Sequence, residues 1–212
     1  MLKITKILTG RNVSVFLNNG ERLLLTYETY SSLMLKSDME LESEVYLRLS
    51  DESSFLNCIS RALSSLARGG KSVYEMRQYL KKKGFDEEII ERALIYLNEK
   101  NYLNDYDFAI NYITRKMCSG KRGRGFIIRE LLKKGVDRKP IDMAIKESGL
   151  CNVDMDLLYE MALKKYKSLK DKKNVYAKIS SFLSYRGFDY DSIASVLRKL
   201  QEENKEDSDF YL

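Results

Sequence analysis

The sequence contains no histidine, only three cysteines and a single proline in 212 residues. Histidine is the commonest general base and metal ligand and belongs to most catalytic triads, so its absence argues against such sites. Cys58, Cys118 and Cys151 form no Cys-x-x-Cys pair, which argues against a zinc ribbon or a thioredoxin-type site and favours reduced thiols. We therefore predict a protein that is not an enzyme and has no catalytic residue, cofactor or bound metal.

Long apolar runs and nucleotide-binding motifs are also missing. No stretch approaches the roughly 20 apolar residues that a membrane span needs, and residues 1–12 lack the apolar core of a secretory signal peptide. We therefore expect a cytoplasmic protein. The glycine-rich segment 120–125 follows no predicted strand and does not match the Walker A pattern, so we do not interpret it as a nucleotide site.

Two pairs of acidic residues leave an enzymatic alternative open. Asp105 lies close to Asp107, and Asp154 lies close to Asp156, as acids do in metal-dependent nucleases. Both pairs fall where helices are predicted to begin, and acids there more often cap the helix or interact with its dipole. We predict that Asp105 is such a cap, and a nuclease at Asp105 and Asp107 is the weaker hypothesis.

The first 27 residues predict a β-hairpin. Apolar residues alternate over 13–17 and again over 23–25, and Asn18-Asn19-Gly20 between them tolerates the positive φ of a tight turn. Residues 2–8 can add a third strand. Because an isolated hairpin is only marginally stable, it must pack against the rest of the chain.

Charge is distributed unevenly along the chain, whose net charge is +6 and whose pI is near 9.0. Residues 28–54 contain seven acids and two bases and are expected to form two short helices. Excess basic charge elsewhere can attract nucleic acid or an acidic protein groove, or can simply keep the protein in solution.

A motif recurs three times with a period near 50 residues. LKKKGFD at 80–86 returns as LLKKGVD at 131–137 and as FLSYRGFD at 182–189, so that the shared glycines are 51 and 52 residues apart. Such a period indicates tandem structural repeats. We predict a mainly α-helical chain of three-helix repeats that form an extended, curved body, with repeats at 55–103, 104–150 and 151–203 and an acidic tail at 204–212.

Each copy of the motif predicts the end of one helix and the start of the next. Basic residues in the last turn suit the negative end of the helix dipole. The glycine (84, 135 or 187) suits the left-handed position after the helix, and an apolar residue follows it. The next residue is an aspartate that can cap the following helix (86, 137 or 189).

Amphipathic helices are also predicted before each motif. The first helix of each repeat is expected over 55–68, 105–118 and 154–169. Ser72 with Glu75 predicts a capping box at the start of the middle helix of the first repeat.

Every repeat carries a basic cluster near corresponding helix ends. The strongest, at 115–139, has ten basic and two acidic residues. Lysines often only solvate an exposed helix face, but bases at the repeat period can follow a phosphate backbone or a repeating protein groove. The candidate binding residues are Arg77, Lys81, Lys82, Arg115, Lys116, Lys121, Arg122, Arg124, Arg129, Lys133, Lys134, Lys164 and Lys165.

The central part of the chain, 101–137, contains a distinctive set of residues. Its residues are Tyr102, Leu103, Asn104, Asp105, Phe108, Ala109, Arg115, Gly120, Gly123, Glu130, Leu131, Gly135 and Val136. With them the segment resembles the central signature of the RecX family, and residues 72–97 resemble the preceding family repeat. The resemblance covers roughly residues 55–200, and the N-terminal part is similar to the extension of longer members.

The resemblance implies a regulator built of three-helix repeats and without enzymatic activity. Members of the family bind RecA, lie in the groove of its filament on single-stranded DNA and inhibit its strand exchange, ATPase and coprotease functions, and some also bind DNA. The implied roles are in homologous recombination, DNA repair and the SOS response, and we expect a monomer. The alternative is a non-specific nucleic-acid-binding repeat module that meets RecA only indirectly.

Overall fold

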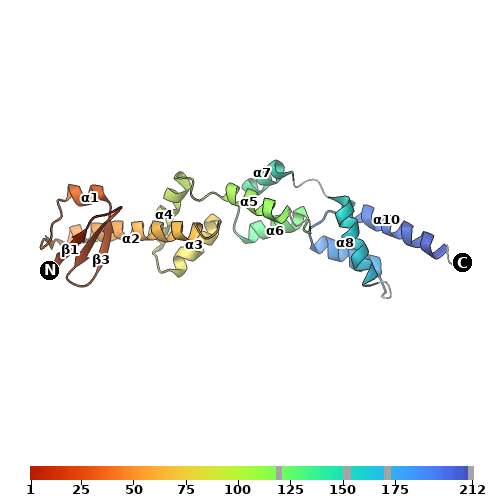
Figure 1. Cartoon of the computed structure of the whole chain (residues 1–212), viewed down its shortest axis with the longest axis horizontal. Coiled ribbons are helices and arrows are strands. Elements are labelled where there is room, and N and C mark those ends of the chain that lie inside the picture. Colours follow the sequence, from red (N-terminus) through yellow and green to blue (C-terminus); the bar gives the residue numbers. More distant parts are fainter. Residues whose placement is uncertain (118–120, 150–153, 170–172, 210–212) are drawn as a thin grey trace. The chain divides into compact units, whose positions relative to one another are not determined.

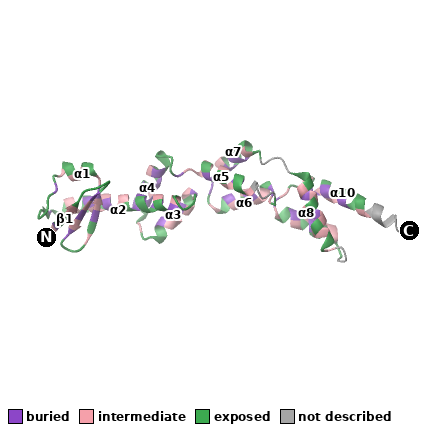
Figure 2. Cartoon of the chain, viewed as in Figure 1, coloured by how far each residue is buried: buried purple, intermediate pink, exposed green. Residues whose placement is uncertain are grey.

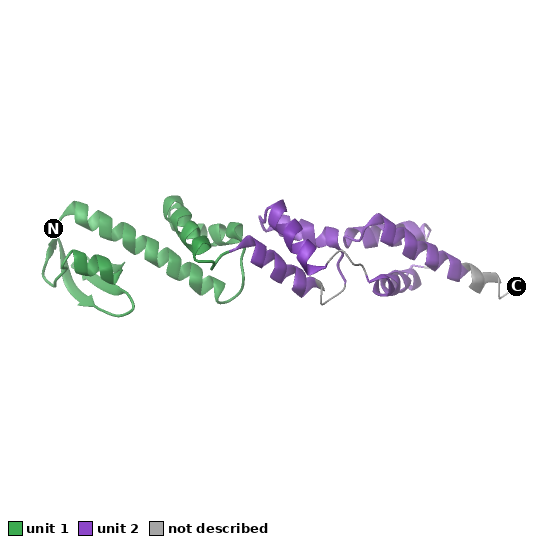
Figure 3. Cartoon of the chain, turned by 90° about the horizontal axis from the view of Figure 1, so that it is seen from above, with its two compact units in different colours: residues 1–103 green, residues 104–212 purple. Residues whose placement is uncertain are grey.

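The computed structural model describes residues 1–117, 121–149, 154–169 and 173–209 of the chain. Two compact units divide it, Met1–Leu103 and Asn104–Leu212 (Figure 3). Cys118, Gly120 and Cys151 lie outside the described residues. No helix in the described ranges has both the length and the apolar character needed to cross a membrane.

The first unit combines a small sheet with four helices (Figure 1). The elements are β1 (Leu2–Leu8), β2 (Val13–Leu17), β3 (Arg22–Leu25), α1 (Tyr27–Ser32), β4 (Glu40–Leu41), α2 (Ser43–Leu66), α3 (Val73–Lys82) and α4 (Glu87–Glu99).

The predicted hairpin is present and belongs to a larger antiparallel sheet. Val15 pairs with Leu23, and Gly20 in the connecting turn has φ of +86°. β1 is the expected third strand, and the two-residue β4 adds a fourth, giving the order β3-β2-β1-β4. Alternate residues of β2 and β3 are fully buried, so one face of the sheet forms the core of this part of the unit.

Helix α2 departs from the sequence-based prediction. Two short helices were expected between 28 and 54, but only α1 is short, and α2 continues without a break through the boundary expected after residue 54. No glycine or proline interrupts 43–66, so nothing in the sequence ends the helix there. Its first half packs on the sheet, where Ser53 Oγ accepts a hydrogen bond of 2.8 Å from the Leu24 amide.

The second half of α2 forms the first three-helix repeat with α3 and α4. Cys58, Met76, Leu80, Ile90 and Leu97 lie in its buried core. The predicted capping box is present at the start of α3: the side chain of residue 72 accepts from the backbone of residue 75, whose carboxylate accepts in return.

The described residues of the second unit form six helices in two groups, each with its own buried core (Figure 2). The helices are α5 (Asp105–Met117), α6 (Arg124–Lys133), α7 (Arg138–Ser148), α8 (Met155–Lys167), α9 (Val175–Tyr185) and α10 (Tyr190–Asp209). The predicted first helices of the second and third repeats are therefore α5 and α8. Helix α10 continues to residue 209, into the segment expected to be an acidic tail.

The three glycine motifs have the predicted geometry. Gly84, Gly135 and Gly187 have φ of +84°, +73° and +86°. After each one, the amide of the apolar residue donates to a carbonyl oxygen five residues earlier, at N–O distances of 3.4, 3.1 and 3.3 Å. This is the Schellman arrangement, in which glycine avoids the steric cost of a β-carbon at positive φ.

The capping aspartates follow the prediction only in part. Asp86 and Asp137 occupy N-cap positions, but their side chains make no cap hydrogen bond. Asp189 does cap, since its Oδ1 accepts from the Ser192 amide at 2.8 Å. That hydrogen bond from the Ser192 amide is the largest cause of the lowered pKa of the Asp189 carboxyl.

The prediction that Asp105 caps α5 is wrong. The preceding residue, Asn104, provides the cap, because its Oδ1 accepts from the amides of Tyr106 and Asp107 at 2.9 and 3.4 Å. Asp105 and Asp107 instead lie in the first helical turn, where their charge suits the helix dipole. Asp154, by contrast, caps α8 as expected for an acid at a helix start.

Candidate binding surface

The basic residues of α3 are largely engaged with acids of α4. The Arg77 guanidinium donates to Glu87 at 3.1 Å and to Glu91 at 3.0 Å, and Lys81 Nζ lies 3.2 Å from a Glu87 oxygen. The hydrogen bond and charge of Lys81, followed by those of Arg77, lower the pKa of the Glu87 carboxyl. Lys82 is exposed. Two of the three candidate residues in the first unit thus have acidic partners.

Ten candidate binding residues lie in the second unit, and several contact aromatic rings. The Arg122 guanidinium lies 4.1 Å from the centre of the Phe126 ring. Lys116 and Lys134 lie over the Tyr112 ring at 5.4 and 5.9 Å. Cations over ring faces are attracted by the ring quadrupole, so these contacts hold basic side chains at the end of α5 and on either side of α6.

The remaining candidates on α5, on α6 and in the segment before α6 differ in their partners. Lys121 and Arg124 are exposed. Arg115 donates to the Asn111 carbonyl at 3.2 Å, and Lys133 lies 3.3 Å from a Glu130 oxygen. Both of these contacts are exposed and leave most of the positive charge available to a ligand.

Arg129 has a structural contact that the sequence did not predict. Its Nη2 donates at 2.9 Å to the carbonyl oxygen of Tyr185, which lies two residues before Gly187 of the third glycine motif. At the same place, the amide of Gly125 donates at 2.9 Å to the carbonyl oxygen of Gly187. The start of α6 is therefore attached to the turn between α9 and α10, and Arg129 is one of the attachments.

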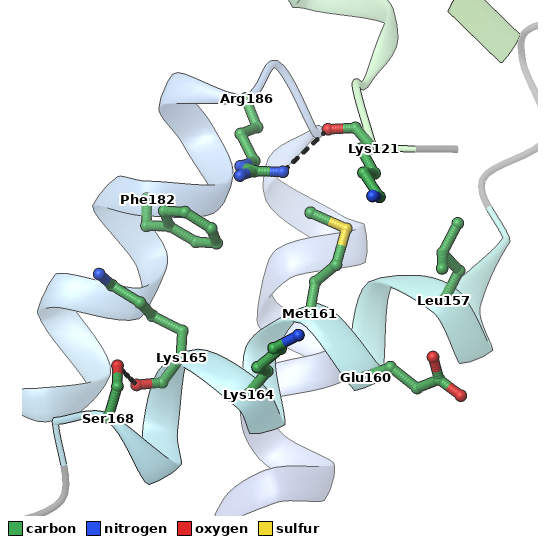
Figure 4. Close-up of a pocket in the computed structure, with 9 residues that line it drawn as sticks. All are labelled: Lys121, Leu157, Glu160, Met161, Lys164, Lys165, Ser168, Phe182 and Arg186. Carbon is green, nitrogen blue, oxygen red and sulfur yellow. Dashed lines mark hydrogen bonds between the residues drawn. The ribbon is translucent and has the colours of Figure 1, made fainter. Parts of the chain in front are cut away.

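One pocket brings together three candidate residues, one from the segment before α6 and two from α8 (Figure 4). Its volume is 470 Å³. The lining consists of Lys121, Leu157, Glu160, Met161, Lys164, Lys165, Ser168, Phe182 and Arg186. The expected binding residues among them are Lys121, Lys164 and Lys165.

Arg186 is a member of this pocket that the sequence-based prediction missed. Its Nη1 donates to the Lys121 carbonyl at 3.3 Å, and its guanidinium lies 4.5 Å from the centre of the Phe182 ring. Arg186 directly precedes the third glycine, as Lys83 and Lys134 precede the first two. The register of the repeats was the signal that could have identified it.

The described ranges offer few side chains suited to catalysis or to metal binding. No three acidic or cysteine side chains there are grouped closely enough to bind a metal ion. Cys58 is fully buried, and burial raises the pKa of its thiol to about 11, so the reactive thiolate is disfavoured. The cationic, partly apolar surface of the second unit is suited to binding an anionic macromolecule.

Comparison with known proteins shows which three-helix domains the repeats resemble. Residues 58–97 match the model of the first three-helix domain of RecX, and residues 152–197 match that of the third. Two solved structures have the same fold: a regulatory protein RecX with a TM-score of 0.74 and 21% identity, and RecX from Lactobacillus salivarius with 0.61 and 22%. They cover 92% and 70% of this chain, which covers 98% and 97% of theirs.

Curated relatives extend the match to almost the whole chain. A regulatory protein RecX of Clostridioides difficile (strain 630) is 31% identical over 194 residues, which cover 89% of both chains. Another, of Clostridium perfringens (strain 13 / Type A), is 32% identical over 212 residues, covering 94% of this chain and 97% of the relative. With this identity over nearly the full length, and with three-helix repeats in the structure, the chain belongs to the RecX family of regulatory proteins.

Proposed function

We propose that this chain binds RecA and its filament on single-stranded DNA and inhibits the recombinase, ATPase and coprotease activities of RecA. It acts as a binding protein rather than an enzyme, and it modulates recombination, DNA repair and the SOS response. A regulator of a bacterial DNA filament acts in the cytoplasm, where the chromosome lies. Family membership supports this proposal, since this chain matches regulatory proteins over 89% and 97% of their own length.

The observation that carries the proposal is the excess of basic side chains at the start of α6. Ten bases and two acids occupy 115–139, and Lys121 and Arg124 are exposed there. A filament of protein on DNA presents phosphates and acidic side chains at regular intervals, and such a surface attracts cations. The first unit contributes less, because Arg77 and Lys81 already pair with acids of α4.

The test is inhibition of RecA ATP hydrolysis on single-stranded DNA. The double variant Lys121→Glu, Arg124→Glu removes two exposed cations without disturbing a buried contact, and we expect its inhibition to require about tenfold more protein. The control is Lys6→Glu with Lys36→Glu, which makes the same change of net charge at two exposed residues of the first unit. If both double variants inhibit RecA as strongly as the parent chain does, Lys121 and Arg124 do not belong to the surface that binds RecA.

The alternative function is non-specific binding of nucleic acid. Tyr185, a residue of α9 that is 73% exposed, favours it, because an exposed ring beside basic residues can stack on a base. This alternative predicts tight binding to bare DNA with a steep dependence on salt, whether or not RecA is present. Strong inhibition of RecA by a chain with little affinity for bare DNA would eliminate it.

A further inference from the structure

The third repeat has a groove along α8 and α9 that is made of two adjoining hollows. The first is the pocket of 470 Å³ already described, and the second has a volume of 620 Å³. Lys165 and Phe182 line both, so the hollows meet at these two residues. Volumes of roughly 300–1,000 Å³ are typical of sites that enclose a ligand group.

Apolar side chains form part of the first hollow. Leu157 and Met161 come from α8, and Phe182 comes from α9 (Figure 4). Met161 and Phe182 are only partly buried and pack with their other sides against the core of this repeat. An apolar ligand group would therefore remove this surface from water, which is favourable.

Cationic side chains surround that apolar surface. Lys121, Lys164, Lys165 and Arg186 line the first hollow, whereas Glu160 is the acid among its described lining residues. Lys178 extends the positive charge into the second hollow. The groove therefore suits a ligand that carries several negative charges next to an apolar group.

The Phe182 ring distinguishes between two kinds of anionic ligand. Lys165 Nζ and the Arg186 guanidinium lie 5.2 and 4.5 Å from its centre. A nucleic-acid base that stacked on this ring would compete with those cations for the ring, whereas an aliphatic or aromatic side chain can enter beside Met161. The arrangement favours a peptide over a nucleotide.

We infer that the groove between α8 and α9 binds an acidic peptide segment that contains one large apolar side chain. The apolar side chain occupies the hollow formed by Leu157, Met161 and Phe182, and flanking carboxylates accept hydrogen bonds from the lysines and arginine around it. The inference rests on the proposed function only in that the chain acts by binding another protein, and its test contains no RecA.

The test is direct binding of a labelled peptide to the full chain, measured by fluorescence anisotropy. The probe is Asp-Glu-Asp-Phe-Glu-Asp-Glu, and the matched probe has serine in place of phenylalanine at the same charge. We expect the serine peptide to bind about tenfold more weakly, since it loses the burial of one aromatic side chain. An oligonucleotide of thymidines is the third probe and is expected to compete poorly with the phenylalanine peptide.

A pair of variants locates the site on the protein. Lys164→Glu reverses an exposed charge that lines the first hollow, and Lys167→Glu makes the same reversal at an exposed position of α8 that lines neither hollow. We expect Lys164→Glu to weaken binding of the phenylalanine peptide about tenfold and Lys167→Glu to change it less than twofold. Equal effects of the two variants, equal binding of the two peptides, or tighter binding of the oligonucleotide would each overturn the inference, while leaving RecA inhibition to be judged separately.

Discussion

Gly123 lies against the carbonyl group of Gly187 so closely that a β-carbon at position 123 would be 2.4 Å from that oxygen. The amide of Gly123 also donates at 2.9 Å to the Arg186 carbonyl oxygen. This contact joins the start of α6 to the turn between α9 and α10, and with it two repeats of the second unit. A glycine in the basic segment thus has a structural role as well as any role in binding.

Gly123→Ala is therefore expected to destabilise the second unit. Gly123 has φ of −82° and ψ of 169°, which alanine adopts freely, so the cost comes from the steric contact alone. Relieving it requires the backbone to move, and we expect a loss of about 2 kcal/mol in the free energy of unfolding, measured by urea denaturation with circular dichroism. Gly69→Ala is the control, because a β-carbon there meets nothing within 4 Å. Equal stabilities of the two variants would contradict the contact.

Gly84→Ala tests the backbone at the end of α3. No atom lies within 4 Å of a β-carbon built there, but φ is +84°, which disfavours any residue with a β-carbon. We expect the free energy of unfolding to fall by about 1 kcal/mol, and by less in Gly84→Asn, because asparagine tolerates positive φ better. Denaturation of both variants provides the measurement. An alanine variant as stable as the parent chain would mean that the Schellman geometry is not required here.

Arg77 is expected to stabilise the packing of α3 on α4. It contacts the exposed Glu87 and, together with it, Glu91, and both Arg77 and Glu91 are partly buried. Arg77→Ala should lower the free energy of unfolding by about 0.5–1 kcal/mol, the range of a partly exposed ion pair. A double-mutant cycle with Glu91→Ala isolates the pair, and a coupling energy near zero would show that the contact contributes nothing.

The buried thiol of Cys58 predicts a dependence of stability on pH. Burial raises its pKa from 9.0 to about 11, so between these values the unfolded chain releases the thiol proton and the folded chain keeps it. The free energy of unfolding should thus fall as pH rises through this range, by about 2 kcal/mol in total from this group. The free energy of unfolding of Cys58→Ala, measured by urea titrations across this pH range, should fall less steeply than that of the parent chain. Parallel slopes for the two proteins would contradict the assignment.

Local patterns allowed most helices and turns to be predicted from the sequence. The turn residues of each glycine motif, the apolar spacing and the capping box at Ser72 all act within a few residues of the chain, and the structure contains each of them. The second short helix was predicted to end by residue 54, but the helix continues to Leu66. The polar run at 50–54 resembles a connection, although no residue in it breaks a helix. Asp105 and Asn104 can both cap a helix, and the choice between them depends on backbone geometry that composition does not reveal.

The binding surface was less predictable because its parts are distant in the sequence. Basic residues could be located, but the pairing of Arg77 with α4 and the contact of Arg129 with Tyr185 depend on tertiary packing. Arg186 meets Lys121 across 65 positions of the chain, and no pattern within a single repeat indicates that contact. Clusters of equal charge in the sequence thus differ in how much of that charge remains available for a partner.

Electron microscopy of this chain mixed with RecA filaments on single-stranded DNA tests the central claim most directly. The proposed function predicts density for the chain on the RecA filament, reduced by the double variant Lys121→Glu, Arg124→Glu and unchanged by Lys6→Glu with Lys36→Glu. Filaments that remain bare, with the chain free or bound only to protein-free DNA, would contradict it.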